Sequence, residues 1–243
     1  MDTILVAVGH ANNDIGVVQQ IETIGKMLRE QGIYFLVDAV QTVGQIPVDV
    51  KQLHVDLLSL SAHKFYGPQG VGALFVRQGI NYAPMILGGD QERNRRAGSL
   101  NVAGIVGLGQ AAKLANGLIL KDASAQILLR EYIIKTVIDN IEGAVLNGHP
   151  TERLPNNAHF SFDGIDGEEL IASLDMVGMC CSMGSACTSG ELTPSHVLKA
   201  IGLSDRMSLG SLRISLGRST TTDDITLFID QLKTNVTKLC NSR

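Results

Sequence analysis

The sequence predicts an α/β protein in which a mostly parallel sheet with flanking helices is followed by a smaller α+β domain. Apolar runs of strand length alternate with longer amphipathic segments, a pattern typical of layered proteins with a parallel sheet. The elements become shorter from about Gly143 onward. The 243 residues suffice to bury a core without help from disulfides or metal. We therefore expect two domains, residues 1–120 and 121–243, joined near residues 115–140.

The first domain begins with a predicted strand, Ile4–Val8, and a predicted helix, Val17–Glu30. The helix has apolar residues at intervals of three and four, and Gly32 stands where helices often end in glycine. The further elements expected here are the strands Ile33–Val37, Asp56–Leu60 and Val71–Val76 and a long helix over Asn101–Ile138. A turn-rich stretch, Lys64–Gly70, separates the last two strands.

The second domain is predicted to consist of shorter elements. Its expected strands are Ala144–Leu146, Ala158–Phe162, Met179–Ser182 and Leu212–Leu216. Its expected helices lie near Glu168–Leu174, from Thr193-Pro194 onward, and from Thr222 to about Leu239. Threonine and proline suit a helix cap and first turn, and the acids after Thr222 suit the positive end of a helix dipole.

Composition and charge exclude several classes of protein. With 44% apolar and 18% charged residues and a net charge of -4, the chain fits neither a disordered nor a nucleic-acid-binding protein. Lys113 and Lys121 interrupt the richest apolar region, so we expect no membrane span. The start, Met1-Asp2-Thr3, lacks the basic residues of a secretory signal. We expect a cytoplasmic protein.

Cysteine usage points to chemistry or core packing, because four cysteines, three of them clustered at Cys180, Cys181 and Cys187, cannot form a disulfide framework. Their spacing with His196 does not fit a zinc site, so no metal is expected. Small residues surround Cys187, as in an exposed loop. We expect Cys180, Cys181 and Cys240 to pack as small apolar side chains.

Two other signals have ordinary structural interpretations. The segment Gly107–Ala112 satisfies a loose dinucleotide-binding pattern, but it lies inside a predicted helix, where close packing would explain its glycines. His54, His149, His159 and His196 have no neighbouring constellation in the sequence, so we expect surface or capping roles for them.

A lysine and an aspartate stand where two predicted strands end. Lys64 follows Asp56–Leu60 closely, and Asp38 ends Ile33–Val37. Such residues are most often a solvated charge and a helix cap, but α/β proteins bind ligands at the carboxyl ends of their strands. A lysine placed there can form a Schiff base with an aldehyde cofactor, and a carboxylate facing a pyridine nitrogen makes that ring an electron sink.

Seven motifs occur in order along almost the whole chain: His10-Ala11-Asn12-Asn13-Asp14-Ile15-Gly16, Val37-Asp38-Ala39-Val40-Gln41, Ser61-Ala62-His63-Lys64, Gly88-Gly89-Asp90-Gln91-Glu92-Arg93, Arg96-Ala97-Gly98-Ser99, Gly184-Ser185-Ala186-Cys187 and Leu212-Arg213-Ile214-Ser215. Together they resemble the cysteine desulfurases of the NifS/IscS type, class-V aminotransferases of fold type I. The resemblance implies that the first domain is part of a fold type I large domain.

The resemblance implies a site for pyridoxal 5'-phosphate. Lys64 would hold the cofactor as an internal aldimine and later move protons on the substrate. Asp38 would face the pyridine nitrogen and Gln41 the phenolic oxygen, while Ser61 and His63 would hold the phosphate.

The resemblance also implies residues for substrate and for a second subunit. Asn13 would lie beside the cofactor and the substrate carboxylate, and Arg213 would clamp that carboxylate with its guanidinium fork. Ser99 keeps a hydroxyl where the family usually has threonine, and would reach the phosphate of the partner subunit in a homodimer.

Cys187 matches the family's nucleophile. Its thiolate would attack the sulfur of L-cysteine, leaving a persulfide on Cys187 and releasing L-alanine. The sulfur would pass to an iron-sulfur scaffold or another acceptor protein. The resemblance therefore implies a cysteine desulfurase that serves iron-sulfur cluster assembly.

The chain departs from the family's pattern at its start. It begins where the middle of the large domain would, without the dimer-forming segment, glycine-rich turn and stacking histidine of the family's first third. Asp90 also replaces a residue that is commonly glycine. Three explanations remain open: a truncated or degenerate product, one part of a split enzyme completed by another chain, and an incomplete record. A non-catalytic remnant acting as a binding module is the alternative function.

Overall fold

The computed structural model describes residues 2–183 and 193–241, which form two compact units. The first unit contains Met1–His10 and Gln19–Ile119, and the second contains Ala11–Val18 and Leu120–Arg243. The short segment Ala11–Val18 therefore belongs with the C-terminal half of the chain, although it lies near the N-terminus in sequence.

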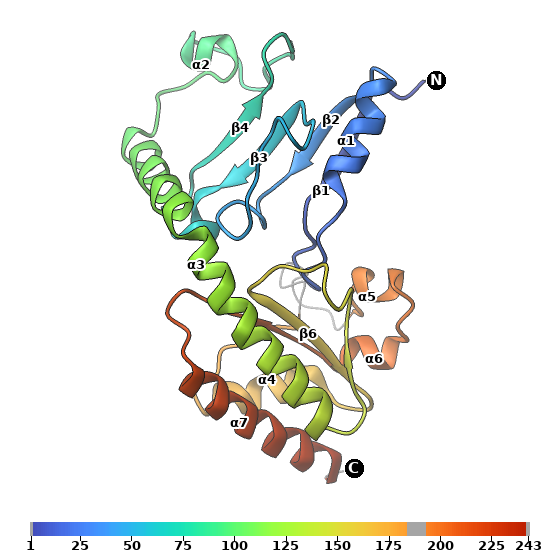
Figure 1. Cartoon of the computed structure of the whole chain (residues 1–243). Helices are drawn as coiled ribbons and strands as arrows, with labels where there is room; N and C mark the ends of the chain where they lie inside the picture. Colours follow the sequence, from blue (N-terminus) through green and yellow to red (C-terminus); the bar gives the residue numbers. More distant parts are fainter. Residues whose placement is uncertain (1, 184–192, 242–243) are drawn as a thin grey trace. The chain divides into compact units, whose positions relative to one another are not determined.

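The first unit is built on a four-stranded sheet in the order β1-β2-β3-β4 (Figure 1). Its strands are β1 (Leu5–Gly9), β2 (Tyr34–Asp38), β3 (Leu57–Ser61) and β4 (Gly72–Val76). The first three strands are parallel, and β4 pairs with β3 antiparallel. The predicted, mostly parallel sheet is confirmed, and the ends of each strand lie within one residue of their predicted positions.

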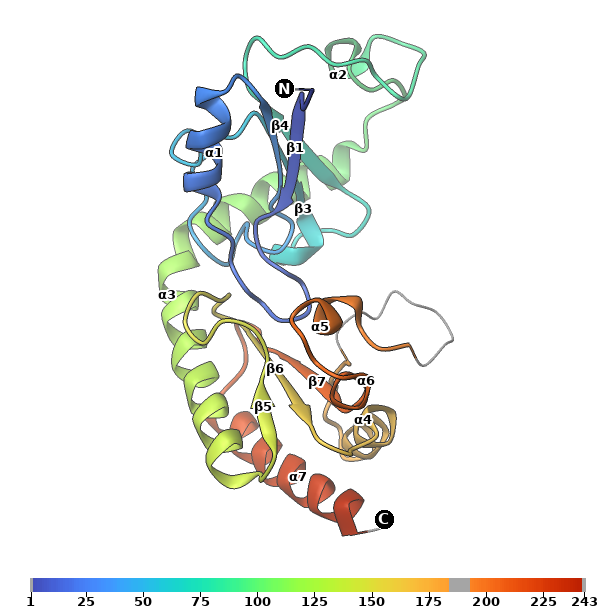
Figure 2. The ribbon, with the colours of Figure 1, turned by 90° about the vertical axis from the view of Figure 1, so that its right-hand side faces the viewer.

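Helix α1 (Ile21–Glu30) packs on one face of this sheet (Figure 2). The buried side chains beneath it include Ile21, Phe35 and Leu58. The helix ends as expected, since Gly32 has a φ of 70°. The predicted start at Val17 is wrong, because Val17 and Val18 form isolated bridges with other residues of the second unit.

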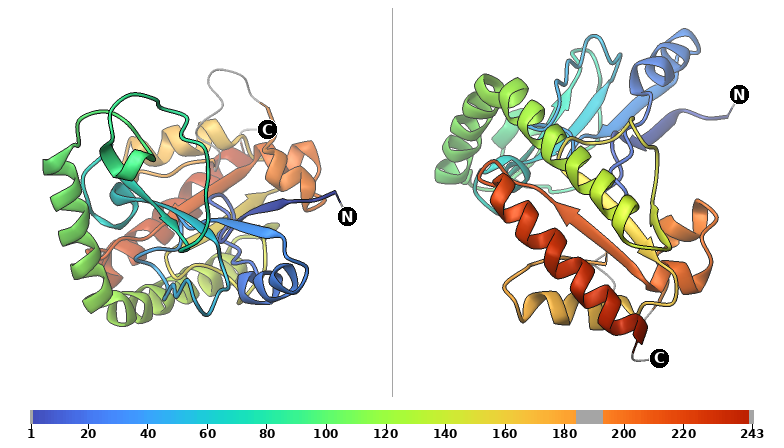
Figure 3. Two further views of the ribbon diagram at one scale, coloured as in Figure 1. Left: turned by 90° about the horizontal axis from the view of Figure 1, so that it is seen from above. Right: turned by 60° about the horizontal axis from the view of Figure 1, so that its bottom comes forward.

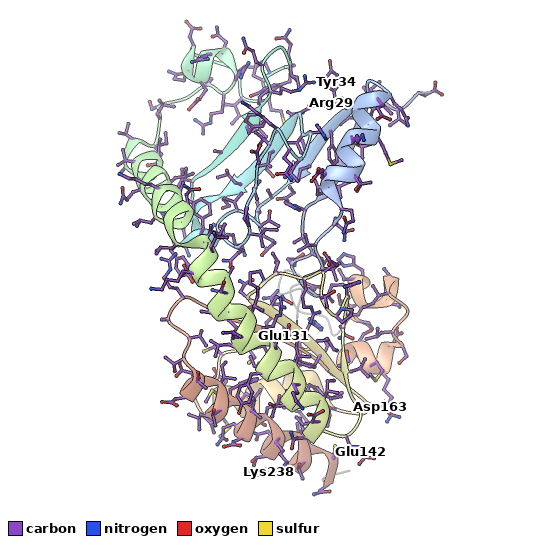
Figure 4. The ribbon with its side chains drawn as sticks, viewed as in Figure 1. Arg29, Tyr34, Glu131, Glu142, Asp163 and Lys238 are labelled. Carbon is purple, nitrogen blue, oxygen red and sulfur yellow. The ribbon has the colours of Figure 1, made fainter. Side chains whose placement is uncertain are left out.

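The opposite face of the sheet remains largely open in the residues that the structure describes. Leu5, Tyr34 and Leu74 point to this face and are 46%, 48% and 45% exposed. Tyr34 is labelled in Figure 4, which shows its side chain at the start of β2. Apolar side chains of this size on a sheet are ordinarily covered, because a parallel sheet buries both faces.

The segment after β4 contains the short helix α2 (Gln91–Asn94) and the long helix α3 (Val102–Asn140). By length and composition α3 could cross a membrane, although the sequence predicts no such segment. In its first half Ala111 and Ala115 pack against Phe65, and in its second half Ile133 and Val137 are fully buried. Each half of α3 therefore contributes side chains to a core, and one helix of this length and composition is weak evidence for a membrane span.

The second unit contains an antiparallel sheet in the order β5-β6-β7, which is labelled in Figure 2 and seen from two further directions in Figure 3. Its strands are β5 (Ala144–Leu146), β6 (Asn157–Phe162) and β7 (Ser211–Ser215), and its helices are α4 (Gly167–Asp175), α5 (His196–Ala200), α6 (Asp205–Leu209) and α7 (Thr222–Asn241). One face of β6 contributes Phe160 and Phe162 to the core formed with α3, α4 and α7. The other face carries Asn157, His159 and Ser161, which are buried as well.

Two local predictions in this unit are wrong, and one helix was not predicted. Met179–Ser182 forms no strand, and only Ser182 makes a bridge, to Arg213. Helix α5 begins after Ser195 instead of at Thr193-Pro194. Helix α6, capped by a hydrogen bond from the Met207 amide to Ser204 Oγ, has no counterpart among the predicted elements.

The predicted roles of several cysteines and histidines also need correction. Cys180 and Cys240 are exposed and not packed in the core, whereas Cys181 is half-buried against it. His159 is fully buried, so its expected surface or capping role is wrong. His149 does cap a turn, since its Nδ1 accepts from the backbone amide of Glu152 at 2.9 Å.

Candidate active site

Lys64 lies in a tight turn directly after β3. The turn is the 3-10 helix η1 (Ala62–Phe65), which ends at Tyr66 in a left-handed conformation with a φ of 67°. The Gly67 amide donates to the Ala62 carbonyl at 2.9 Å, and a side chain at Gly67 would approach the Ala62 Cβ to 2.8 Å. The turn is therefore closely packed beneath, while Lys64 itself is exposed.

Ser61 and His63 form a polar pair at the start of the same turn. The Ser61 hydroxyl and His63 Nδ1 are 2.8 Å apart. Ser61 is half-buried and His63 is exposed. A hydroxyl and an imidazole held in contact offer adjacent hydrogen-bonding groups to an anion.

Asp38 ends β2 at the same edge of the sheet. Its Oδ1 accepts from the Val40 amide at 2.9 Å and from Ser59 Oγ at 3.2 Å, while Oδ2 has no hydrogen-bond partner among the described residues. Asp38 is opposite Ser59 in the parallel register of β2 and β3. Because the carboxyl ends of parallel strands meet at one edge, the fold brings Asp38 and the Lys64 turn to the same edge.

Gln41 lies in the turn that follows β2, and Ser99 lies between α2 and α3. Gln41 is half-buried in the turn after β2, which is closed by a bond from the Thr42 amide to the Ala39 carbonyl at 3.0 Å. Ser99 is exposed between α2 and α3, next to Gly98, whose amide donates to Gln91 Oε1 at 3.0 Å.

His10 is buried beside the end of β2, where its amide donates to the Asp38 carbonyl at 2.8 Å. It is 4% exposed, and its Nδ1 lies 3.0 Å from the hydroxyl of Thr42. Burial lowers the pKa of His10 below its usual value. A neutral His10 thus joins the end of β1 to the turn that carries Gln41.

Asn13 lies in the segment Ala11–Val18, which docks on the second unit. The Asn12 side chain accepts from the amides of Asp14 and Ile15 at 2.9 and 3.0 Å, which folds the segment into a tight turn. Asn157 Nδ2 donates to the Asp14 carbonyl at 3.1 Å. These contacts fix the backbone around Asn13, whose own side chain reaches Asp14 Oδ1 at 2.9 Å.

Arg213, on β7, contacts this segment directly. Its Nη1 donates to the Asn13 carbonyl at 3.2 Å and lies 4.0 Å from Asp14 Oδ1. The guanidinium is partly exposed, with 22% of the side chain accessible. The structure therefore brings together the two residues predicted to bind the substrate carboxylate, Asn13 and Arg213.

A buried polar network lies on the same face of the second sheet. Asn147 Nδ2 donates to His159 Nδ1 at 2.9 Å and to Ser161 Oγ at 2.8 Å. Burial, with smaller effects from Arg213 and Arg153, lowers the pKa of His159 to about 3. His159 is therefore a neutral hydrogen-bond acceptor through Nδ1 and carries no charge at neutral pH.

Arg153 is a buried cation near this network. Its Nη2 donates to the Ile15 carbonyl at 3.1 Å and also to the Asn147 carbonyl. Burial, followed by the charge of Arg130, lowers the pKa of Arg153 to about 10, which leaves it protonated at neutral pH. Arg130 pairs with the exposed Glu131 on α3 (Figure 4). Arg153 thus ties the Asn13 segment to the second unit.

Cys187 lies outside the described residues, as does the rest of the segment 184–192. Of its described neighbours, Met183 accepts at its carbonyl from Ser211 Oγ at 3.2 Å, and Ser195 Oγ donates to Asp14 Oδ2 at 3.0 Å. Cys181 is a weak candidate for a thiolate, because burial raises its pKa to about 11.

Sequence reasoning missed Asp14, Ser195 and the His159 network. Asp14 was visible as the one charged residue of the Asn-Asn-Asp motif, whereas nothing in the sequence marks Ser195 as its partner 181 positions away. Groups of three or more potential metal ligands are absent from the part of the chain that the structure describes, where no metal site is therefore assigned.

Comparisons with known proteins match nearly all of the chain. The family model described as Aminotransferase class-V matches residues 1–228. The cysteine desulfurase IscS of Dictyoglomus turgidum is 49% identical over 98% of this chain and 60% of the relative. That of Methanosarcina thermophila is 48% identical over 99% of this chain and 59% of the relative.

Solved structures agree with these relatives. A NifS-like protein superposes with a TM-score of 0.88 and 34% identity, covering 98% of this chain and 62% of that one. The NifS-like protein from Rickettsia africae gives a TM-score of 0.87 and 32% identity, covering 95% and 61%. The chain thus spans about 60% of the length of the curated relatives it matches. By sequence and by structure, the chain belongs to the aminotransferase class-V family.

Proposed function

We propose that this chain is the portion of a cysteine desulfurase that contains the catalytic lysine and the catalytic cysteine. The complete enzyme would transfer sulfur from L-cysteine to Cys187 as a persulfide, release L-alanine, and pass the sulfur to an iron-sulfur scaffold or another acceptor protein. The observation that carries the proposal is the shared sheet edge of Asp38 and the Lys64 turn. The relatives named cysteine desulfurases support the choice of reaction.

The residues at this edge fit pyridoxal 5'-phosphate, the usual cofactor of the class-V family. Asp38 Oδ2, without a partner among the described residues, suits a protonated pyridine nitrogen. The adjacent Ser61 and His63 suit a phosphate, and the exposed Lys64 amine would bind the aldehyde. Gln41 would hydrogen-bond the phenolic oxygen. When bound, the cofactor supplies an electron sink for bonds at the substrate Cα.

The chain's own residues would bind the substrate and move its atoms. Arg213 and Asn13 would hold the carboxylate of L-cysteine, and Lys64 Nζ would carry protons to and from the substrate carbon. The Cys187 thiolate would form a bond to the substrate sulfur while the carbon–sulfur bond breaks. The electron pair of that bond would stay with the carbon, which leaves in L-alanine after gaining a proton.

The assembly is proposed to be a cytoplasmic homodimer. Ser99 lies exposed next to α3, so its hydroxyl is accessible to a partner subunit and could reach that subunit's phosphate. The complete enzyme would have its domain boundary near residue 120 of this chain. A separate polypeptide could supply the part of the relatives that this chain does not span.

A second candidate is a binding module without catalysis, one part of a split enzyme or a remnant. The exposed Leu5, Tyr34 and Leu74 favour it, because an open sheet face offers a surface for another chain. The presence of bound cofactor separates the two candidates, since only the enzyme would be yellow.

The experiment that tests the proposal is borohydride reduction in the presence of pyridoxal phosphate, followed by peptide mass mapping. The wild-type assembly should carry the reduced cofactor on Lys64, and Lys64→Ala should lose it. Lys51→Ala, which changes an exposed lysine in the turn before β3, is the matched control and should keep the adduct. A retained adduct in Lys64→Ala on Lys51 or Lys113 would overturn the proposal.

A further inference from the structure

Asp14 is a buried carboxylate to which the reaction assigns no role. It is 1% exposed, and each of its carboxylate oxygens accepts a hydrogen bond. Oδ1 accepts from Asn13 Nδ2 at 2.9 Å, and Oδ2 accepts from Ser195 Oγ at 3.0 Å. Taking a carboxylate out of water is unfavourable unless it is paired and hydrogen-bonded, so the partners of Asp14 indicate what it does.

The charge that balances Asp14 belongs to Arg213. Nη1 of Arg213 lies 4.0 Å from Asp14 Oδ1, beyond hydrogen-bond distance, and donates instead to the Asn13 carbonyl at 3.2 Å. Asp14 thus attracts the guanidinium without accepting a hydrogen bond from it. The attraction acts from the buried side, whereas Arg213 remains partly accessible.

The position of Asp14 itself is rigidly held. Its amide donates to Asn12 Oδ1 at 2.9 Å, and its carbonyl accepts from Asn157 Nδ2 at 3.1 Å. Gly16, two residues later, has a φ of 73°, and a side chain there would approach Asn157 Oδ1 to 2.6 Å. A fixed charge of this kind orients a neighbouring cation at little entropic cost.

We propose that Asp14 is a positioning residue for the amino-acid carboxylate site. Its carboxylate fixes the positions of the Asn13 side-chain amide and the Arg213 guanidinium relative to each other. The Ser195 hydroxyl fixes the carboxylate by a hydrogen bond. The ligand class, an α-amino acid, rests on the proposed function. The positioning of Arg213 by Asp14 rests on the contacts within the second unit alone.

The two physical effects of Asp14 on carboxylate binding have opposite signs. A negative charge near Arg213 lowers the potential that attracts an anion, so simple electrostatics predicts that Asp14→Asn binds a carboxylate more tightly. Loss of positioning predicts weaker binding, because the ligand must then supply the part of the order of Arg213 that Asp14 provides. The sign of the change in KM for L-cysteine therefore distinguishes the two.

The test uses the chain together with the polypeptide that completes it, with 15N-arginine only in this chain. In Asp14→Asn, positioning predicts that the Arg213 Nε–H signal shifts and exchanges with water at least about fivefold faster, and that KM for L-cysteine rises about tenfold with little change in kcat. Ser195→Ala, which keeps the charge, should show a smaller change of the same sign. If Asp14→Asn does not fold, the Arg213 signal and KM of Ser195→Ala decide whether Asp14 positions Arg213.

Asp163→Asn is the matched control, because Asp163 pairs with Arg206 at 2.7 Å on the surface of the same unit. It should alter the Arg206 signal and leave Arg213 and KM unchanged. An unchanged Arg213 signal in Asp14→Asn and Ser195→Ala, or a fall in KM, would overturn the proposal. If the wild-type assembly does not turn over L-cysteine, the proposed function fails, but the Arg213 signal still decides the role of Asp14.

Discussion

His159 is a histidine that folding keeps uncharged. Its pKa of about 3 in the folded chain lies below the usual value of 6.5, chiefly because it is buried. Between these values the unfolded chain binds more protons than the folded one, so the free energy of unfolding falls as pH falls from 6.5 toward 3. Well above pH 6.5 the residue adds no pH dependence.

Replacing His159 should therefore flatten the acid side of the stability profile. From pH 7.5 to pH 5, protonation of this one residue in the unfolded chain should remove about 2 kcal/mol of stability, and His159→Asn should abolish that loss. Urea unfolding of the second unit at both pH values measures it. Ser161→Ala, which removes another bond of the network, should lower stability equally at both. An equal acid slope in wild type and His159→Asn would contradict the prediction.

The residues of the sheet edge could be placed from the sequence, but the buried partners could not. Asp38 and Lys64 follow apolar runs closely, and strand ends alone put them at one edge. Asp14 and Asn157 are 143 positions apart and meet only because Ala11–Val18 docks on β6. No local pattern encodes that docking, so neither the burial of Asp14 nor that of His159 was visible.

At the level of elements, α3 offers a matched pair of glycines. A side chain at Gly107 would approach Pro68 Cγ to 2.5 Å, whereas nothing lies within 4 Å of a side chain at Gly109. Close packing thus explains Gly107 but not Gly109. The loose dinucleotide-binding pattern lies inside α3, as expected, and not at a strand-to-helix turn.

Replacing each glycine by alanine should change the free energy of unfolding in opposite directions. Gly107→Ala should lower the free energy of unfolding by about 1–3 kcal/mol, because it overpacks the contact with Pro68 beside the Lys64 turn. Gly109→Ala should raise it by about 0.5–1 kcal/mol, since alanine favours a helix over glycine. Denaturant unfolding of both variants measures the difference. Equal losses in the two variants would show that both glycines serve a role that the packing does not explain.

Elements with strong periodicity were predictable, and elements decided by distant contacts were not. The seven observed strands of the described residues and the helices α3, α4 and α7 follow their apolar patterns to within a few residues, whereas the strand expected at Met179–Ser182 does not form. Val17 was predicted to be helical because its spacing fits, yet it bridges to Arg153. Ser195 precedes α5 with its hydroxyl directed to Asp14, so the helix starts later than Thr193-Pro194 suggests.

At the scale of the whole molecule, two observations indicate that the chain works together with another polypeptide. One is the open sheet face, and the other is that the chain spans about 60% of the length of its relatives. Leu5, Tyr34 and Leu74 are about half exposed on a sheet that would ordinarily be covered on both faces. β1 is also an edge strand, with backbone groups available for pairing. We therefore expect the 243-residue chain alone to be poorly soluble or to bind pyridoxal phosphate weakly, and the remaining part of the relatives to restore both properties.

The central claim is most directly tested by sulfur transfer from L-cysteine in the completed assembly. We predict L-alanine release together with a persulfide, found by mass spectrometry on the peptide that contains Cys187. Lys64→Ala and Cys187→Ser should release no alanine, and Cys187→Ser should still bind the cofactor. Sulfur found mainly on Cys180 or Cys181, or full activity from a soluble, yellow dimer of this chain alone, would contradict the account.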